Sequence, residues 1–350
     1  LNPGPTFTYL TGLQMHLMER PTVLFITSFG QAALVLPYLE KEKLAGLELE
    51  LQAFTYEDDP ATWGGAFREA IEALGLAQAK LAAEPSRLRL LELQFIQAAA
   101  PNAAIIDGSP IVEGLRLKKD TQELAKMREA AVIAQKALVE TLKHIHPGMS
   151  EKQIAAELVI ALYQAGSDIE LPFEPIVSSG PNTANPHAAP SERLLQEGDL
   201  LLFDWGASKD GYFSDITRTF TVGEVEPELQ HIGEVVLAAN AKGREIAAPG
   251  MPAGAVDKAV RAVIESAGYG EYFTHRTGHG LGMEAHEAPY IFGANSQLLA
   301  PGMVFTIEPG IYLPGRGGVR IEDDMVITEN GVHSLTDLPR AVVPYNTPFD

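Results

Sequence analysis

The sequence predicts an α/β (α+β) protein of two domains, an N-terminal domain at residues 1–115 and a larger C-terminal domain at residues 116–350. Three observations support this prediction. The 350 residues are enough for two domains of ordinary size, each with its own core. Short apolar runs alternate with amphipathic stretches over the first 112 residues. The later part contains an internal repeat, which indicates two halves related by pseudo-twofold symmetry.

The N-terminal part has the pattern of mixed strands and helices. Apolar runs rich in β-branched and aromatic residues predict strands at 22–26, 32–36, 47–54 and 102–106. Amphipathic spacing predicts helices at 61–74 and 86–98. A longer helix is expected from about Asp120 to His144, where Pro147-Gly148 ends it. Nothing in the first 112 residues indicates catalysis.

The composition excludes several classes of function. A formal net charge of −20 argues against a nucleic-acid partner, because the phosphates would be repelled. No window approaches 18 uninterrupted apolar residues and no secretory leader is visible, so we expect a cytoplasmic protein without a membrane span. The sequence has no cysteine, so any metal must be bound by His, Asp, Glu or backbone oxygen.

The repeat lies in the second part of the chain. Residues 147–166 begin with Pro-Gly-Met, have a helical pattern and end with Ala-Gly, and residues 249–268 do the same 102 positions later. His187-Ala188-Ala189-Pro190 is echoed by His286-Glu287-Ala288-Pro289, and the apolar run before Asp204 is echoed by the run before Glu308. Four such elements recur in one order, so we interpret them as duplicated halves of one closed domain rather than as a solenoid.

Each half carries two acids on a predicted hairpin. A turn between Lys209 and Asp210 would place Asp204 opposite Asp215, and a turn at Gly315 would place Glu308 opposite Glu322. Four carboxylates on mostly apolar strands would repel one another without cations, and two divalent ions would cancel their formal charge. The alternative is that these acids are exposed or pair with Arg218 and Arg320.

A glycine-rich segment supplies a neutral metal ligand. His279 lies within Thr277-Gly278-His279-Gly280, where glycines let the backbone approach a small ion closely. His275 lies four residues earlier, but the intervening glycine argues against a zinc-binding helix, so we expect His275 to be a packed or surface residue. The glycine spacing also differs from that of a dinucleotide-binding loop.

Five blocks of sequence, at 202–207, 211–220, 277–280, 306–310 and 320–323, resemble the signature blocks of the pita-bread metallopeptidases. Within that family the chain is most similar to the Xaa-Pro dipeptidase (prolidase) and Xaa-Pro aminopeptidase branch. The resemblance covers both domains and implies a creatinase-like N-terminal domain followed by a pseudo-twofold pita-bread catalytic domain. It implies hydrolysis of the Xaa-Pro bond in dipeptides by a hydroxide that bridges two divalent ions (Mn, Co or Zn, with Mn favoured). It also implies a homodimer.

The resemblance assigns roles to individual residues. Asp215 and Glu322 would bridge the two ions, and the full ligand set would be Asp204, Asp215, His279, Glu308 and Glu322. His187 and His286 would flank the substrate, and Glu308 would carry a proton from the attacking water to the leaving nitrogen. Arg320 would contact the substrate or support a ligand, and its alternative is an ion pair with Asp323 or Asp324.

The sequence favours an Xaa-Pro dipeptidase over four other functions. An Xaa-Pro aminopeptidase acting on longer peptides is the main alternative, because the sequence does not show what closes the far side of the cleft. A non-catalytic pita-bread binding protein is disfavoured, since all seven ligand and histidine positions are kept. The domain before the catalytic one disfavours a methionine aminopeptidase, and the metal ligands disfavour a creatinase-like amidinohydrolase.

Overall fold

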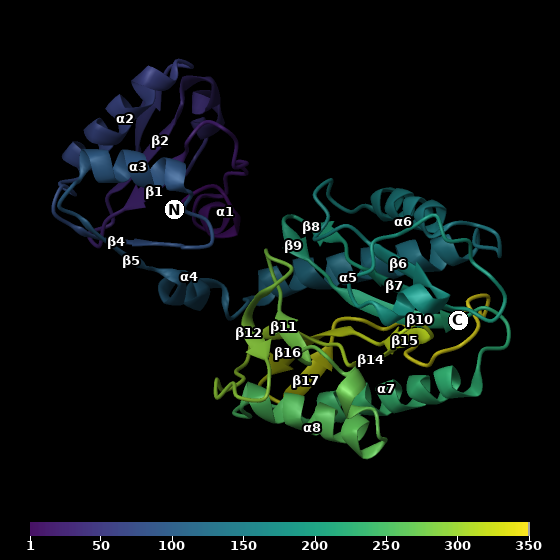
Figure 1. Ribbon diagram of the computed structural model, residues 1–350. Coiled ribbons are helices and arrows are strands. Elements are labelled where there is room, and N and C mark those ends of the chain that lie inside the picture. The colour runs from purple at the N-terminus through teal and green to yellow at the C-terminus, as the bar shows by residue number, and fades with distance from the viewer. Residues whose placement is uncertain (349–350) are drawn as a thin grey trace. The chain divides into compact units, whose positions relative to one another are not determined.

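The computed structural model describes residues 1–348, which form two compact units that meet in sequence between Arg116 and Leu117. Each unit is described by itself (Figure 1). Among the described residues, no helix is both long and apolar enough to cross a membrane.

The N-terminal unit is a small α/β unit, as the sequence predicts. β1 (Val23–Ile26) runs antiparallel to β2 (Ala32–Pro37), which runs parallel to β3 (Gln52–Tyr56). Its core contains Trp63 and Phe67 of α2 (Pro60–Ala73) and Ile96 of α3 (Leu90–Ala99). The remaining elements are α1 (Pro5–Thr11), the 3-10 helix η1 (Tyr38–Leu44), the parallel pair β4 (Lys80–Ala83) and β5 (Ala104–Asp107), and α4 (Ser109–Arg116).

Two predictions for this unit were inaccurate. The strand expected at 47–54 begins only at Gln52, because residues 47–51 follow η1 as irregular chain. β4 was not predicted, since its four residues alternate exposed and partly buried positions without an apolar run. Both errors concern short elements whose position is decided by a neighbouring strand.

The second unit places helices outside two sheets. One sheet has the order β10-β7-β6, and the other has the order β12-β11-β13-β16-β17. In Figure 1, α5 and α6 lie on one side of the strands and α7 and α8 on the other. The first sheet consists of β6 (Ile176–Ser179), β7 (Leu200–Trp205) and β10 (Ile216–Thr221), and β8 (Ser208–Lys209) pairs with β9 (Tyr212–Phe213). The second consists of β11 (Gly278–Gly280), β12 (Glu287–Ile291), β13 (Val304–Ile307), β16 (Asp323–Thr328) and β17 (Gly331–Ser334), and β14 (Gly310–Leu313) pairs with β15 (Gly317–Arg320).

Two of the long helices begin at side-chain caps that the sequence provides. Asp120 forms a capping box with Glu123 at the start of α5 (Thr121–Leu142), and Ser150 forms one with Gln153 at the start of α6 (Glu151–Ala165). Gly166 ends α6 in the left-handed conformation. The other two helices are α7 (Pro227–Ile246) and α8 (Ala253–Ser266), and two short 3-10 helices are η2 (Gly180–Ala184) and η3 (Gly270–Tyr272).

The structure confirms the duplication. The Gly148 amide donates to the Leu195 carbonyl at 2.8 Å, and the Gly250 amide donates to the Leu299 carbonyl at 2.7 Å. Each Met that follows these glycines accepts a hydrogen bond from the same leucine. The two copies of the Pro-Gly-Met helix therefore dock in the same way in both halves.

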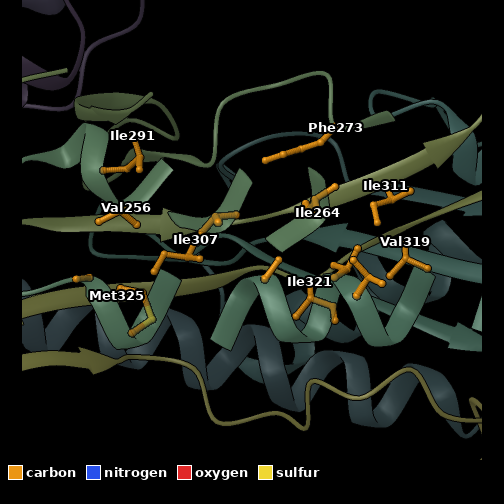
Figure 2. Packing of buried hydrophobic residues seen from close by; sticks show 14 of the residues in the cluster. Val256, Ile264, Phe273, Ile291, Ile307, Ile311, Val319, Ile321 and Met325 are labelled. Atoms are coloured by element: carbon orange, nitrogen blue, oxygen red, sulfur yellow. The ribbon is translucent and has the colours of Figure 1, made fainter. Parts of the chain in front are cut away.

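Separate hydrophobic clusters hold the two halves rigid. In the second half, Val256 and Ile264 of α8 pack with Ile307 of β13, Ile311 of β14 and Ile321, which follows β15 (Figure 2). In the first half, α5 and α6 pack on Phe203 and Trp205 of β7. Burial of each such side chain contributes about 1.5–3 kcal/mol to the stability of the folded protein, relative to leaving the side chain exposed. The polar residues on these same strands are thereby fixed in place.

Strand register decides which acids face each other. In the second hairpin Gly310 pairs with Arg320 and Ile307 pairs with Asp323, which is the register predicted from a turn at Gly315. In the first hairpin Asp204 pairs with Thr217 and not with Asp215, so the predicted pairing was wrong by two residues. The turn lies between Asp210, with φ of 50°, and Gly211. Because side chains alternate along a strand, a shift of two residues keeps Asp215 on the predicted face.

Candidate active site and metal centre

Both halves of the second unit contribute to one pocket of about 690 Å³. All eight residues singled out from the sequence line it: His187, Asp204, Asp215, His279, His286, Glu308, Arg320 and Glu322. The sheets also join here, since the Glu322 amide donates to the Thr217 carbonyl at 3.1 Å across the two halves. The pocket therefore lies where the duplicated halves meet.

Four carboxylates and one imidazole form a compact cluster in this pocket. Ligand atoms of Asp204, Asp215 and Glu322 lie within 4.8 Å of one another, and so do those of His279, Glu308 and Glu322. The His279 Nε2 atom is 3.4 Å from Glu308 Oε1 and 3.7 Å from Asp215 Oδ2. Glu322 belongs to both groups, so the cluster can hold more than one ion.

Burial makes the acids of this cluster costly to ionise. Burial, followed by the charges of Glu322 and Asp204, raises the pKa of Asp215 well above its ordinary value. Burial raises the pKa of Glu308 to about 8, with Arg320 opposing the rise, and burial with the charge of Glu308 raises the pKa of Glu322. Among the described residues, the buried Oδ1 atoms of Asp204 and Asp215 have no hydrogen-bond partner. A divalent cation would stabilise the ionised acids and would bind the two oxygens that have no partner.

His279 is held so that one ring nitrogen faces the acids. Its Nδ1 atom lies 3.1 Å from the Gly280 carbonyl, which leaves Nε2 directed at the cluster. Burial, with the neighbouring His286, lowers the pKa of His279, so the imidazole is neutral and available as a donor. A Cβ atom at Gly278 would lie 1.9 Å from the Thr306 carbonyl oxygen, which explains why this strand requires glycine.

The other two predicted histidines stand beside the cluster. The His286 ring centroid is 3.9 Å from that of His279, and His286 is exposed and lines the pocket. Burial and then the charge of Arg276 lower the pKa of His286. His187 lines the pocket from the opposite half, and its backbone amide donates a hydrogen bond to Asn185 Oδ1 at 3.1 Å.

Arg320 supports one of the acids. Its Nη2 atom is 2.5 Å from Asp204 Oδ2, and its other nitrogens donate to Thr217 Oγ1 at 3.0 Å and to the Tyr312 hydroxyl at 3.0 Å. The alternative ion pair of Arg320 with Asp323 or Asp324 is wrong. Asp323 instead pairs with Arg218 and Arg340, both at 2.7 Å.

Several residues of the site were missed by sequence reasoning. The Tyr312 hydroxyl links Arg320 to His275, whose Nε2 lies 2.8 Å away. His275 lines the pocket but is not among the cluster atoms, and burial lowers its pKa to about 4. Asp324 accepts a hydrogen bond from the Asp215 amide at 3.1 Å and is fully buried. The alternation along β14 and β16 was the available signal, because Tyr312 and Asp324 each share a face with an acid.

Comparison with known proteins identifies the family of both units. Residues 125–329 match metallopeptidase family M24, and residues 1–118 match the Creatinase/Prolidase N-terminal domain. An Xaa-Pro dipeptidase of Lactobacillus helveticus is 36% identical over 332 residues, which cover 95% of this chain and 90% of that protein.

Solved structures give the same result. A dipeptidase of Pyrococcus horikoshii OT3 is 38% identical, with a TM-score of 0.92 over 98% of this chain and 94% of that one. An X-Pro aminopeptidase of Thermotoga maritima MSB8 is 31% identical, with a TM-score of 0.84 over 98% and 96%. These similarities confirm the predicted creatinase-like and pita-bread folds. With the match over residues 125–329, they show that the chain belongs to metallopeptidase family M24.

Proposed function

We propose that the chain is a metal-dependent Xaa-Pro dipeptidase. The observation that carries the proposal is the cluster of four carboxylates and His279 in a pocket formed by both halves, with two buried carboxylate oxygens that lack a partner among the described residues. The family is one of metallopeptidases, and relatives of similar length are named Xaa-Pro dipeptidase and dipeptidase.

The donor set fits divalent ions. Asp204 and Asp215 would hold one ion and His279 with Glu308 the other, with Asp215 and Glu322 shared between them. Oxygen donors with one imidazole suit Mn, Co or Zn, and the predominance of carboxylates favours Mn. When bound, such ions supply a water acidic enough to attack a peptide carbonyl at neutral pH.

The protein residues would then position the substrate and move the proton. His187 and His286, from opposite halves, would donate hydrogen bonds to the substrate carbonyl and to the oxyanion that develops on it. Glu308 would take a proton from the attacking water and deliver it to the leaving nitrogen. This delivery matters for proline, because its nitrogen carries no hydrogen in the peptide and must gain one to leave.

Arg320 would act on the cluster rather than on the peptide. It keeps one oxygen of Asp204 occupied, so the other oxygen, Oδ1, is left for a cation. The homodimer that the resemblance implies and the cytoplasmic location expected from the sequence also belong to this proposal, and light scattering on the purified protein tests the first.

The test is peptide hydrolysis by protein supplied with Mn, Co or Zn. We expect cleavage of Ala-Pro to alanine and proline. Failure to cleave both Ala-Pro and Ala-Pro-Ala with each ion would reject the peptidase function. Cleavage of Ala-Pro-Ala without Ala-Pro would establish the aminopeptidase alternative, which similarity to the Thermotoga maritima structure keeps open.

A further inference from the structure

The pocket has an unequal set of charged side chains. Its acids are Glu174, Asp204, Asp215, Glu308 and Glu322, and its permanent cations are Arg276 and Arg320. A dipeptide carries a carboxylate directly on its second residue. When the dipeptide enters the pocket, that carboxylate loses water and needs a fixed positive charge close by, because desolvation without a partner is costly.

Arg320 is not available for this task. Its guanidinium already contacts Asp204, Thr217, Tyr312 and the Pro186 carbonyl, and its side chain is almost completely buried. A second carboxylate would have to displace one of these partners.

Arg276 is the remaining cation. It lies two residues before β11, and within residues 1–348 no carboxylate forms an ion pair with it. Its guanidinium carbon is 4.5 Å from the centroid of the Tyr290 ring, and its backbone carbonyl is 2.8 Å from His275 Nδ1. Its charge lowers the pKa of both His286 and Glu308, so its field reaches the catalytic cluster.

We infer that Arg276 binds the C-terminal carboxylate of the dipeptide and thereby selects dipeptides over longer peptides. The inference rests on the proposed peptidase function. A guanidinium offers two parallel N–H groups to a carboxylate, and stacking on Tyr290 holds its plane in place before the substrate arrives. Less side-chain entropy is then lost on binding. A tripeptide has an amide at that position, which carries no charge for Arg276 to meet.

The test compares Ala-Pro with Ala-Pro amide, which differ only in the charge of the terminal group. Wild type, Arg276→Gln and Arg276→Lys are assayed on both, with Arg316→Gln as a control. The control also removes a positive charge, but Arg316 lies on the β14–β15 turn and pairs with Glu226 and Glu228 outside the pocket.

For Arg276→Gln we expect kcat/KM on Ala-Pro to fall about 10- to 100-fold, the range of a hydrogen bond to a charged group, mainly through a higher KM. On Ala-Pro amide the kcat/KM of Arg276→Gln should change by less than about threefold. On Ala-Pro, Arg276→Lys should lose less of its kcat/KM than Arg276→Gln does. In Arg316→Gln the ratio of kcat/KM on Ala-Pro to kcat/KM on Ala-Pro amide should be unchanged.

If Arg276→Gln lowers kcat/KM equally on both substrates, so that the ratio of the two values is unchanged, the inference is overturned. The peptidase function stands in that case as long as wild type cleaves Ala-Pro. A wild type that cleaves neither substrate would reject the peptidase function itself. Thermal unfolding and metal content of each variant show whether a loss comes from a damaged fold, and Arg276→Lys supplies the ratio if Arg276→Gln does not fold.

Discussion

Removing the metal ions should make the catalytic unit less stable as the pH rises from 6.5 to 8. Without cations, the buried carboxylates keep protons that they release on unfolding. Glu308 has an ordinary pKa of 4.5, and burial raises it to about 8 in the folded protein. A group whose pKa is raised by folding stabilises the protein fully below its unfolded pKa, and this contribution is lost as the pH rises toward the folded value.

The size of the effect follows from Glu308. Between pH 6.5 and 8 the stability falls by about 1.4 kcal/mol per pH unit for each such group, which gives about 2 kcal/mol for Glu308 alone. The pKa values of Asp215 and Glu322 are raised as well, so these acids act in the same direction. The histidines with lowered pKa values act weakly in the opposite direction, because near pH 6.5 the unfolded state still holds protons on them that the folded state does not. Wild type and Glu308→Gln share this contribution.

The assay is urea unfolding of chelator-treated protein at four pH values between 6.5 and 8. The fluorescence of Trp205, buried beside Asp204, reports on this unit in a Trp63→Phe background. Glu308→Gln is the control, since it removes one titrating carboxyl. The comparison of wild type with this variant also cancels the contributions of titrating groups elsewhere in the chain.

We expect wild type to lose about 2 kcal/mol more than Glu308→Gln over this pH range. Saturating divalent ion should remove most of the difference, because the ion replaces the protons. Parallel profiles for the two metal-free proteins would refute the reasoning, as would a wild type that gains stability relative to the variant.

Three further substitutions test other parts of the account. Asp323→Asn should lower the free energy of unfolding by about 3–5 kcal/mol in a urea titration, since it leaves Arg218 and Arg340 without their buried counter-charge, and a loss below about 1 kcal/mol would contradict this. Gly278→Ala should cost about 3 kcal/mol or more, because its Cβ would overlap the Thr306 carbonyl, whereas Gly114→Ala, in open space on a helix, should be neutral or slightly stabilising by thermal unfolding. Tyr312→Phe should reduce kcat/KM on Ala-Pro about tenfold by removing the hydroxyl that orients Arg320, and an unchanged rate would contradict this role of the hydroxyl.

Sequence reasoning was strongest where a pattern repeats. The two Pro-Gly-Met helices, and the acids at the ends of two apolar strands, identified the duplicated unit and the region of the site. The N-terminal unit was also predicted in outline. Its short strand β4 was not, because four residues carry too little periodicity to be recognised.

Register and partner choice were harder to predict. The left-handed conformation of Asp210 moved the first turn by one position, which shifted the pairing of Asp204 by two residues. Arg320 is close in sequence to Asp323 and Asp324, yet its backbone position on β15 directs it to Asp204, 116 residues away. Such contacts depend on how the two halves dock, which a linear pattern does not contain.

The central claim is that the two halves together bind a pair of divalent ions. Its most direct test is the metal content of chelator-treated protein reloaded with Mn, measured by elemental analysis and by calorimetric titration, for wild type and Asp215→Asn. We predict two ions per wild-type chain and the loss of tight binding of the pair in Asp215→Asn, since that residue would be shared by both ions. A wild-type chain that binds no ion at the cluster, or an Asp215→Asn chain that binds two with unchanged affinity, would contradict the account.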